Sequence, residues 1–457
     1  MITSGHRCHW ERYPGCSWLL FRGIVGLPYC EGRYSCPKGA GLHALRRWES
    51  ARHNVCAERD RSVKATGGCS GGASPEPARS PVWTLAYGGN FGVGVLLKLC
   101  LPSFQVVLIV LGILRFFLAS CVVVYHLSGH VPSIGILAVN FFYVISGYLM
   151  TLVLNETYSF KTRSFFVNRL LRLYPAQLVL CAISLPFIWI LPRAIEFNPA
   201  WGSPQWQDWI GNVLIFPWTF LPQQHFRILP ATWSIAVEIW SYFFLWLFVS
   251  RRSWTAVLSM ACAVLWQIHL FRTGAEAGAH YFPVSAALLP FSCGAISYFV
   301  ISHPTLARIE RRASSFTQIV LLCAVIATFL LNWSLAVRID PSVYYGVFYY
   351  LNILLACIAV GMLHGLRARG KYEHFTAWCG DISYPVFLVQ WGSGFVAWHL
   401  IGTDAPAHSW PTFIVGYVIS VIVGIVTVKL VDRPIHRIRA RVRSNARNSS
   451  MRCEKTT

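Results

Sequence analysis

An arginine and a histidine, Arg115 and His126, lie eleven residues apart inside one apolar run that covers residues 113–127. Eleven residues make about three helical turns, so the two side chains would share one helix face and lie about 16 Å apart along the axis. Ionisable groups at membrane depth are costly and usually serve a function. A histidine can take and return a proton near neutral pH, and an arginine can hold a phosphate through two hydrogen bonds. The pair therefore predicts anion binding at one level of a helix and proton transfer about three turns further along.

Glu238 is the only carboxylate in the apolar windows that are long enough to cross a bilayer. Ser234 and Ser241 lie four residues before it and three after it, which places all three on one helical stripe. A buried carboxylate without a partner is expensive, so we expect Glu238 to face other helices and to pair with a cation, a histidine or a bound hydroxyl. A structural ion pair with Arg115 is the alternative interpretation.

The composition indicates a membrane protein, because 55% of the 457 residues are hydrophobic, 12% are charged and the mean hydropathy is +0.49. We predict an all-α, polytopic chain with about ten transmembrane helices. The windows that predict them are 105–127, 133–155, 173–192, 231–250, 254–270, 280–301, 316–332, 344–364, 382–402 and 411–431.

Basic residues fix the expected orientation, because Lys and Arg accumulate in cytoplasmic loops. With His126 at the outer end of the first helix, the inner segments hold twenty basic residues and the outer segments only four. This predicts that both ends of the membrane domain lie in the cytoplasm. The formal charge of +21 then follows from topology and indicates contact with anionic membrane lipids rather than with nucleic acid.

The sequence divides into three parts. Residues 1–100 are rich in Gly, Ser, Arg and Cys without a helical or strand period, so we expect either an unstructured tail or translation from a start site placed too far upstream. Residues 101–440 form the membrane domain, and residues 441–457 form a basic cytoplasmic tail. The cysteines show no Cys-x-x-Cys pair before residue 100, which gives little support to a zinc site.

From about residue 104 to residue 439 the chain resembles acyltransferase family 3, the integral membrane enzymes that O-acylate surface polysaccharides, glycolipids and small secreted molecules. Six segments carry the resemblance, and they follow one another in the order of the family. They are Leu114-Arg-Phe-Phe-Leu-Ala-Ser-Cys-Val-Val-Val-Tyr-His, Asn140-Phe-Phe-Tyr-Val-Ile-Ser-Gly-Tyr, Arg169-Leu-Leu-Arg-Leu-Tyr-Pro-Ala, Thr232-Trp-Ser-Ile-Ala-Val-Glu-Ile-Trp-Ser-Tyr, Ile382-Ser-Tyr-Pro-Val-Phe-Leu-Val-Gln-Trp and Val431-Asp-Arg-Pro-Ile.

The resemblance implies an enzyme of the bacterial inner membrane that moves an acyl group, most simply acetyl, from cytoplasmic acyl-coenzyme A to a hydroxyl of a sugar or lipid-linked glycan. It implies no bound cofactor or metal. His126 would be the catalytic residue, with Arg115 and Glu238 beside it in the reaction. Residues expected to bind substrate are Arg169, Arg172, Asn140, Ser146, Trp233 and Ser234.

Several of these residues also allow a structural interpretation. His126 could hydrogen-bond between helices without chemistry, Arg115 could extend to the membrane interface, and Arg169 and Arg172 could serve only as topology determinants. His126 and His130 could form a metal pair, but no carboxylate follows in the pattern His-Glu-x-x-His.

Two positions depart from the family pattern. Asn140 stands where the family often has aspartate, and Gln390 stands where it often has histidine. Neither side chain can act as a base. We interpret both substitutions as tuning of acceptor recognition.

Two other classes of protein compete with the enzyme. A transporter would use the same ionisable residues as a substrate or proton path, but the sequence shows no internal repeat. A non-catalytic lipid- or glycan-binding membrane protein would keep the fold without turnover.

Overall fold

The computed structural model describes residues 102–219, 225–303, 315–339, 346–364 and 371–456. All regular elements within these residues are helices, and one isolated bridge joins Trp201 to Phe226. This confirms the predicted all-α class for the described part of the chain. The expectation for residues 1–100 lies outside the described residues.

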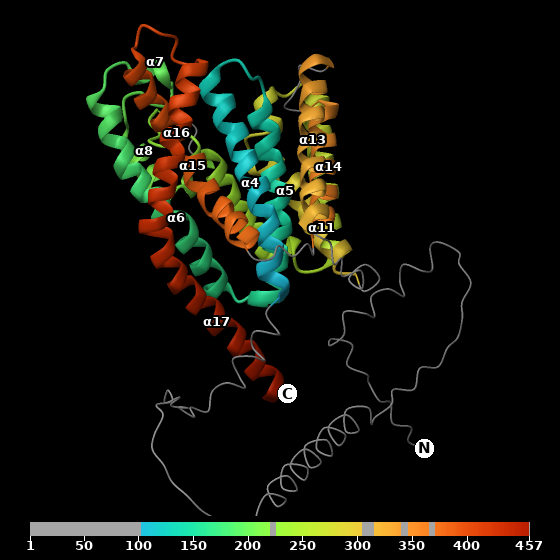
Figure 1. Ribbon diagram of the computed structural model, residues 1–457. Helices are drawn as coiled ribbons and strands as arrows, with labels where there is room; N and C mark the ends of the chain where they lie inside the picture. The colour runs from blue at the N-terminus through green and yellow to red at the C-terminus, as the bar shows by residue number, and fades with distance from the viewer. Residues whose placement is uncertain (1–101, 220–224, 304–314, 340–345, 365–370, 457) are drawn as a thin grey trace, which may run out of the picture. The chain divides into compact units, whose positions relative to one another are not determined.

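The described residues form a bundle that is built mainly from long helices (Figure 1). The long helices are α4 (Pro102–Ser128), α5 (Ile134–Val153), α6 (Thr162–Ile190), α9 (Thr232–Phe244), α10 (Ser253–Thr273), α11 (Val284–Ile301), α13 (Ser315–Ile339), α14 (Val347–Leu363), α15 (Lys371–Ile401), α16 (Trp410–Thr427) and α17 (Arg433–Thr456). The short elements are η3 (Leu154–Tyr158), α7 (Ala194–Phe197), α8 (Trp206–Leu214), η4 (Phe216–Thr219), η5 (Leu245–Val249), η6 (Ala277–His280) and η7 (Val428–Asp432).

Eight helical stretches of the described residues are long and apolar enough to cross a membrane, by length and composition. Two of the ten predicted windows, 344–364 and 382–402, correspond to α14 and α15, which are not among the eight. At 17 residues, α14 is short for a span. The multi-spanning architecture is therefore confirmed, while the number ten and the orientation of the termini stay predictions.

Helix ends differ from the hydropathy windows where polar residues extend a helix. The third window begins at residue 173, whereas α6 begins at Thr162 and includes the basic turns before it. Similarly, α15 begins at Lys371, well before residue 382. A hydropathy window finds the apolar part of a helix but not a polar end that projects beyond the hydrocarbon.

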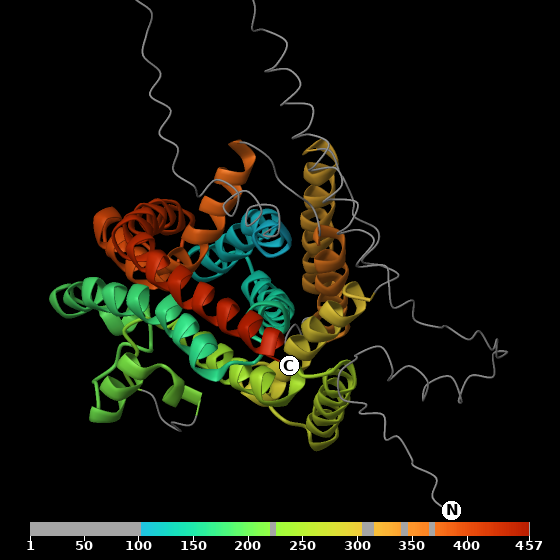
Figure 2. The same cartoon turned by 90° about the horizontal axis from the view of Figure 1, so that it is seen from below.

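The centre of the described unit is formed by α4, α5 and α15, with α13 and α14 on one side and α6 and α16 on the other (Figures 1 and 2). Helix α5 packs closely on α11 because Gly147 has no side chain. A Cβ atom at Gly147 would lie 2.2 Å from the carbonyl oxygen of Phe291, which real atoms do not allow. Ser146, the neighbour of this glycine, is thereby held at a fixed level of the bundle.

Helix α15 contains a proline, Pro385, at the level where it faces α4. Proline has no backbone N–H to donate to the carbonyl four residues earlier, so the helical hydrogen bonding is interrupted there. Ser383, Tyr384 and Phe387, which lie on either side of Pro385, line a cavity inside the bundle.

The bundle has two distinct ends. Figure 1 shows α17 leaving it at the end where α4 begins, whereas α7 and α8 lie at the end where α4 finishes. Arg115 lies at the middle of α4, and His126 lies in its last turn, so Arg115 is the nearer of the two to the end from which α17 leaves.

Candidate active site

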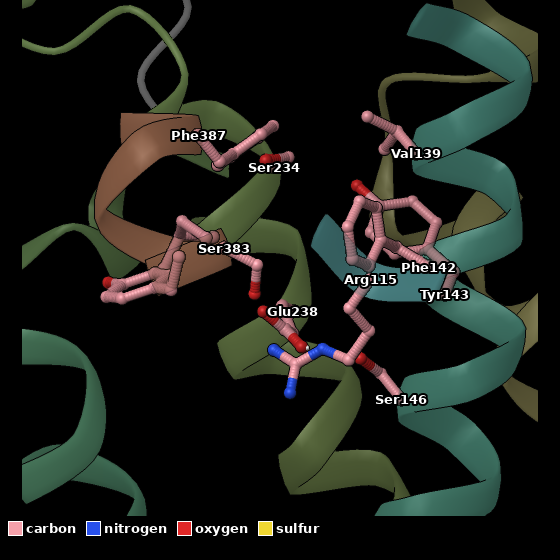
Figure 3. Close-up of a pocket in the computed structure, with 11 residues that line it drawn as sticks. Arg115, Val139, Phe142, Tyr143, Ser146, Ser234, Glu238, Ser383 and Phe387 are labelled. Atoms are coloured by element: carbon pink, nitrogen blue, oxygen red, sulfur yellow. Dashed lines mark hydrogen bonds between the residues drawn. The ribbon is translucent and has the colours of Figure 1, made fainter. Parts of the chain in front are cut away.

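A cavity opens between α4, α5, α9 and α15 (Figure 3). The cavity has a volume of about 60 Å³, which is enough for a few water molecules. Its walls combine two charged side chains with hydroxyl groups and aromatic rings. The lining residues are Arg115, Val139, Phe142, Tyr143, Ser146, Ser234, Ile235, Glu238, Ser383, Tyr384 and Phe387. Of the predicted site residues, the cavity brings together Arg115, Ser146, Ser234 and Glu238.

The Glu238 carboxylate is held by two hydroxyl groups. Ser146 Oγ donates a hydrogen bond of 2.8 Å to Glu238 Oε1, and the Tyr242 hydroxyl donates to the same oxygen. Tyr242 follows Glu238 by four residues and shares its face of α9, whereas Ser146 reaches the carboxylate from α5. The described residues form no hydrogen bond to Glu238 Oε2. One carboxylate oxygen is therefore fixed by the protein, and the other can serve a ligand.

Arg115 reaches the cavity from α4, and Figure 3 shows its guanidinium directed toward Glu238. The two groups interact electrostatically, but they form no ion pair within 4.0 Å in the described part of the chain. Arg172 and Asp381 also contribute to the electrostatic environment of Arg115. Arg115 and Glu238 therefore do not form the direct ion pair that was considered as the structural alternative. Both charged side chains face the cavity.

Replacing Ser146 with alanine removes one of the two donors that hold Glu238. We expect Ser146→Ala to lower kcat about 3-fold to 10-fold, because one hydrogen bond to a charged group is lost while the Tyr242 hydrogen bond remains. Initial rates of acyl transfer measure this effect. Thr328→Ala removes a hydroxyl that bonds within the exposed face of α13, so it serves as the control. Equal rates for Ser146→Ala and wild type would contradict the assigned contact.

His126 lies beyond the cavity on the same helix and also faces α15. Its Nδ1 atom lies 3.1 Å from Oε1 of Gln390, and its ring lies 4.7 Å from the ring of Trp391 and 4.9 Å from that of Tyr125, between centroids. Gln390 follows Phe387, a cavity residue, by one helical turn. Gln390 Nε2 donates a hydrogen bond of 2.8 Å to the carbonyl oxygen of Phe387. The cavity and His126 therefore follow one another along the interface between α4 and α15.

Helix α7 and the loop before α16 cover the His126 end of this interface. The Phe197 ring lies 6.2 Å from that of Trp391, and the Phe197 carbonyl lies 3.2 Å from His408 Nε2. His408 belongs to the loop before α16, and burial lowers its pKa, so it is neutral at pH 7. His130, the other half of the metal pair considered above, bonds through Nδ1 to the Ser128 carbonyl and stacks on Trp410.

Arginines gather at the opposite end of the site. Arg169 on α6 is only 5% exposed, and its Nε has no hydrogen-bond partner. Its guanidinium reaches Asn168 at 3.5 Å and lies 5.8 Å from the centroid of the Phe165 ring. A buried guanidinium with an open donor is expensive unless an anion binds it.

Arg439 of α17 joins Arg169 and Arg172, although no sequence pattern distinguishes it from the other arginines of the tail. The three arginines interact electrostatically, and Arg439 Nε also lacks a partner. The side-chain amide of Asn168 donates a hydrogen bond of 3.1 Å to the backbone carbonyl of Arg439, and this bond links α17 to α6. Asp432 lies within electrostatic range of Arg172 and Arg439, but none of these pairs is within 4.0 Å. We call Arg169, Arg172 and Arg439 the arginine cluster.

Two further predicted substrate-binding residues, Asn140 and Trp233, belong neither to the cavity walls nor to the arginine cluster. Asn140 is fully buried and accepts a 3.0 Å hydrogen bond from Asn352 on α14. Trp233 packs its ring 4.8 Å from that of Phe282. The sequence did not indicate that Tyr242 holds Glu238 or that Ser383 and Tyr384 line the cavity. For Tyr242 a signal was present, since a hydroxyl four residues after a buried carboxylate shares its helix face.

Residues 109–429 match the model of a family that is described as an acyltransferase domain. The match covers more than half of the 457 residues and includes the cavity, His126, Arg169 and Arg172. Arg439 lies beyond it.

Curated relatives are similar over the same region. The chain is 23% identical over 298 residues to the peptidoglycan O-acetyltransferase OatA of Listeria monocytogenes, covering 60% of this chain and 47% of the relative. It is 21% identical over 327 residues to the putative peptidoglycan O-acetyltransferase YrhL of Bacillus subtilis, covering 63% and 50%. It is 33% identical over 138 residues to the O-acetyltransferase OatA of Staphylococcus aureus, covering 27% and 22%. The chain thus spans half the length of these relatives or less, and no solved structure matches it.

Proposed function

Because this chain belongs to acyltransferase family 3 and is an integral membrane O-acyltransferase, we propose that it moves an acetyl group from cytoplasmic acetyl-coenzyme A to a hydroxyl of a cell-surface glycan. Peptidoglycan is the first acceptor to consider, because the names of two relatives specify it. Other surface polysaccharides and glycolipids offer the same chemistry. The membrane is the bacterial inner membrane in this proposal.

One observation carries the proposal: the arginine cluster, the Arg115–Glu238 cavity and His126 follow one another from one end of the bundle toward the other. The excess of basic residues in alternate loops favours a cytoplasmic position for the arginine cluster. An anionic donor made in the cytoplasm would then meet cations first, and an acceptor outside would meet His126. The order of the groups matches the direction in which the acyl group has to travel.

The donor side of the mechanism rests on the arginines. Arg169, Arg172 and Arg439 would hold the phosphates of coenzyme A, because guanidinium groups bind phosphate oxygens through paired hydrogen bonds. The thioester arm would pass Arg115 toward His126. The cavity as it stands holds only a few waters, so side chains such as Tyr384 and Phe387 have to move when the donor enters.

The acceptor side rests on His126. His126 would accept the proton of the acceptor hydroxyl while the hydroxyl oxygen attacks the thioester carbonyl. The carbon–sulfur bond then breaks, and the coenzyme A thiolate takes up the proton. Glu238 would orient the acceptor or donor through its free oxygen. A covalent acyl-histidine that later passes the acyl group to the acceptor is the alternative, and it would show ping-pong kinetics.

Purified protein in lipid nanodiscs tests the proposed reaction. We expect coenzyme A release from acetyl-coenzyme A that depends on an added muropeptide or oligosaccharide, together with a product heavier by one acetyl group in mass spectrometry. Acetyl-coenzyme A omitted from the mixture is the control. Transport of the donor or acceptor into sealed vesicles without an acetylated product would favour the transporter, and binding without turnover would favour the non-catalytic protein.

A further inference from the structure

We propose that Gln390 is a positioning residue that holds His126 in the tautomer protonated on Nδ1 and leaves Nε2 as the atom that accepts a proton. This inference rests on the proposed function, because it gives an atom to the general base. It also gives a different reason for glutamine at this position from the acceptor recognition inferred from the sequence. Gln390 contacts the proposed base itself.

The orientation of the Gln390 amide follows from its second contact. Gln390 Nε2 lies 2.8 Å from the carbonyl oxygen of Phe387, and a carbonyl oxygen can only accept a hydrogen bond. The amide nitrogen must therefore face Phe387. A flipped amide would place two acceptors against each other at this site. The amide oxygen is consequently the atom that faces His126.

The tautomer of His126 follows from the orientation of the amide. Gln390 Oε1 can only accept, so the His126 Nδ1 atom, 3.1 Å away, must carry the proton. A neutral imidazole has one N–H, which leaves the lone pair on Nε2. The rings of Tyr125 and Trp391, with centroids 4.9 Å and 4.7 Å from that of His126, restrict reorientation of the imidazole.

The neutral Gln390 amide affects the protonation of His126 differently from a carboxylate at the same position. A carboxylate at position 390 would stabilise the imidazolium form, whereas an amide fixes the tautomer without adding a charge. The titratable groups that face His126 are Tyr125 on its own helix and His408 in the loop before α16. No carboxylate of the described residues is among these groups. Without a carboxylate beside it, His126 is neutral and can accept a proton at neutral pH. A histidine at position 390 could also accept the hydrogen bond from the Nδ1–H group of His126.

Three substitutions at this position test the proposal in the full-length protein in nanodiscs. We expect Gln390→Leu to lower kcat about 10-fold to 30-fold with the KM for acetyl-coenzyme A unchanged, because one hydrogen bond to the base is lost. We expect Gln390→His to keep activity within about 3-fold of wild type, because it restores an acceptor for Nδ1–H. Steady-state rates over a donor concentration series separate kcat from KM.

The pH profile gives a readout that a merely structural role would not change. A general base works in its deprotonated form, so kcat/KM rises as pH increases through its pKa. Gln390→Glu places a carboxylate beside the imidazole, which favours the protonated form. We expect the acidic limb of the profile to move to higher pH by about one unit or more. A lower rate with an unmoved acidic limb would overturn the proposal.

A second buried glutamine–histidine pair provides a matched control. Gln267 on α10 is 3% exposed, and its Oε1 lies 2.8 Å from His280 Nδ1. Gln267→Leu breaks the same kind of contact away from the cavity, and we expect kcat and the pH profile of wild type per folded molecule.

The outcomes separate this inference from the proposed function. Wild-type kcat in Gln390→Leu, together with inactivity of His126→Ala, would overturn the positioning role alone. Full activity of His126→Ala, or no acetyl transfer by wild type, would overturn the proposed function as well.

Discussion

His126→Ala is expected to lower kcat for acetyl transfer about 1,000-fold or more, to near the limit of detection. The substitution removes the only imidazole on the α4–α15 interface next to the cavity in the described chain, and general base catalysis contributes about 100-fold to 10,000-fold to an acyl transfer. The KM for the donor should change little, because the arginines that would hold the phosphates remain. Acceptor-dependent release of coenzyme A measures both constants.

The control for His126→Ala is His130→Ala, which removes a histidine from the same end of the chain. His130 is exposed and stacks on Trp410 rather than facing α15. We expect activity within about 2-fold of wild type, as is usual for a surface substitution that touches no functional group. Radiolabelled acetyl-coenzyme A without acceptor adds a second measurement. Stable label on wild type but not on His126→Ala would support the acyl-histidine route, and turnover by His126→Ala at the wild-type rate would refute both routes.

The second large effect concerns the arginine cluster. We expect Arg169→Ala to raise the KM for acetyl-coenzyme A about 10-fold to 100-fold, because a charge-assisted hydrogen bond to phosphate contributes about 1.5 to 3 kcal/mol. Arg439→Ala should raise the same KM by a similar factor if α17 is part of the donor site. Isothermal titration with coenzyme A gives the affinities directly, without turnover.

Arg193 supplies the matched control for this series. It is an exposed arginine whose Nη2 atom lies 2.7 Å from Glu196 Oε2, in a segment that the predicted topology places outside the membrane. Arg193→Ala should leave the donor KM at its wild-type value. Arg169→Lys should recover only part of the affinity, because an ammonium group lacks the paired donors of a guanidinium. Unchanged coenzyme A affinity in both Arg169→Ala and Arg439→Ala would reject this end of the bundle as the donor site, and the proposed direction of transfer with it.

Much of this architecture could be predicted from local sequence. The spacing of Arg115 and His126 predicts a shared helix face, and in the structure both side chains face α15. Glu238 faces other helices as expected, but the groups that bond to it are the protein hydroxyls of Ser146 and Tyr242 rather than the cation, histidine or bound hydroxyl that the sequence analysis names. These inferences succeed because helical periodicity and the cost of burying charge act within one segment.

Features that depend on contacts between distant segments could not be predicted in this way. Arg439 is one of many arginines in a basic tail, and only the packing of α17 on α6 distinguishes it. The contact between Gln390 and His126 joins residues that are 264 positions apart. Trp233 stands in a family motif, yet its ring packs on Phe282 instead of lining the cavity. A single sequence does not encode such distances in any local pattern.

Pro385 makes α15 easier to bend at the level of the proposed active site. The missing hydrogen bond at this proline makes bending of α15 less costly there than elsewhere along its length. Ser383, Tyr384 and Phe387, which surround the proline, are also walls of the cavity. A small flexing of one helix could therefore widen the passage for a thioester arm while the interface between α5 and α11, closed by Gly147, stays rigid. The acyl path would then open by a hinge in its wall, and the helices that hold Arg115 and Glu238 would not have to separate.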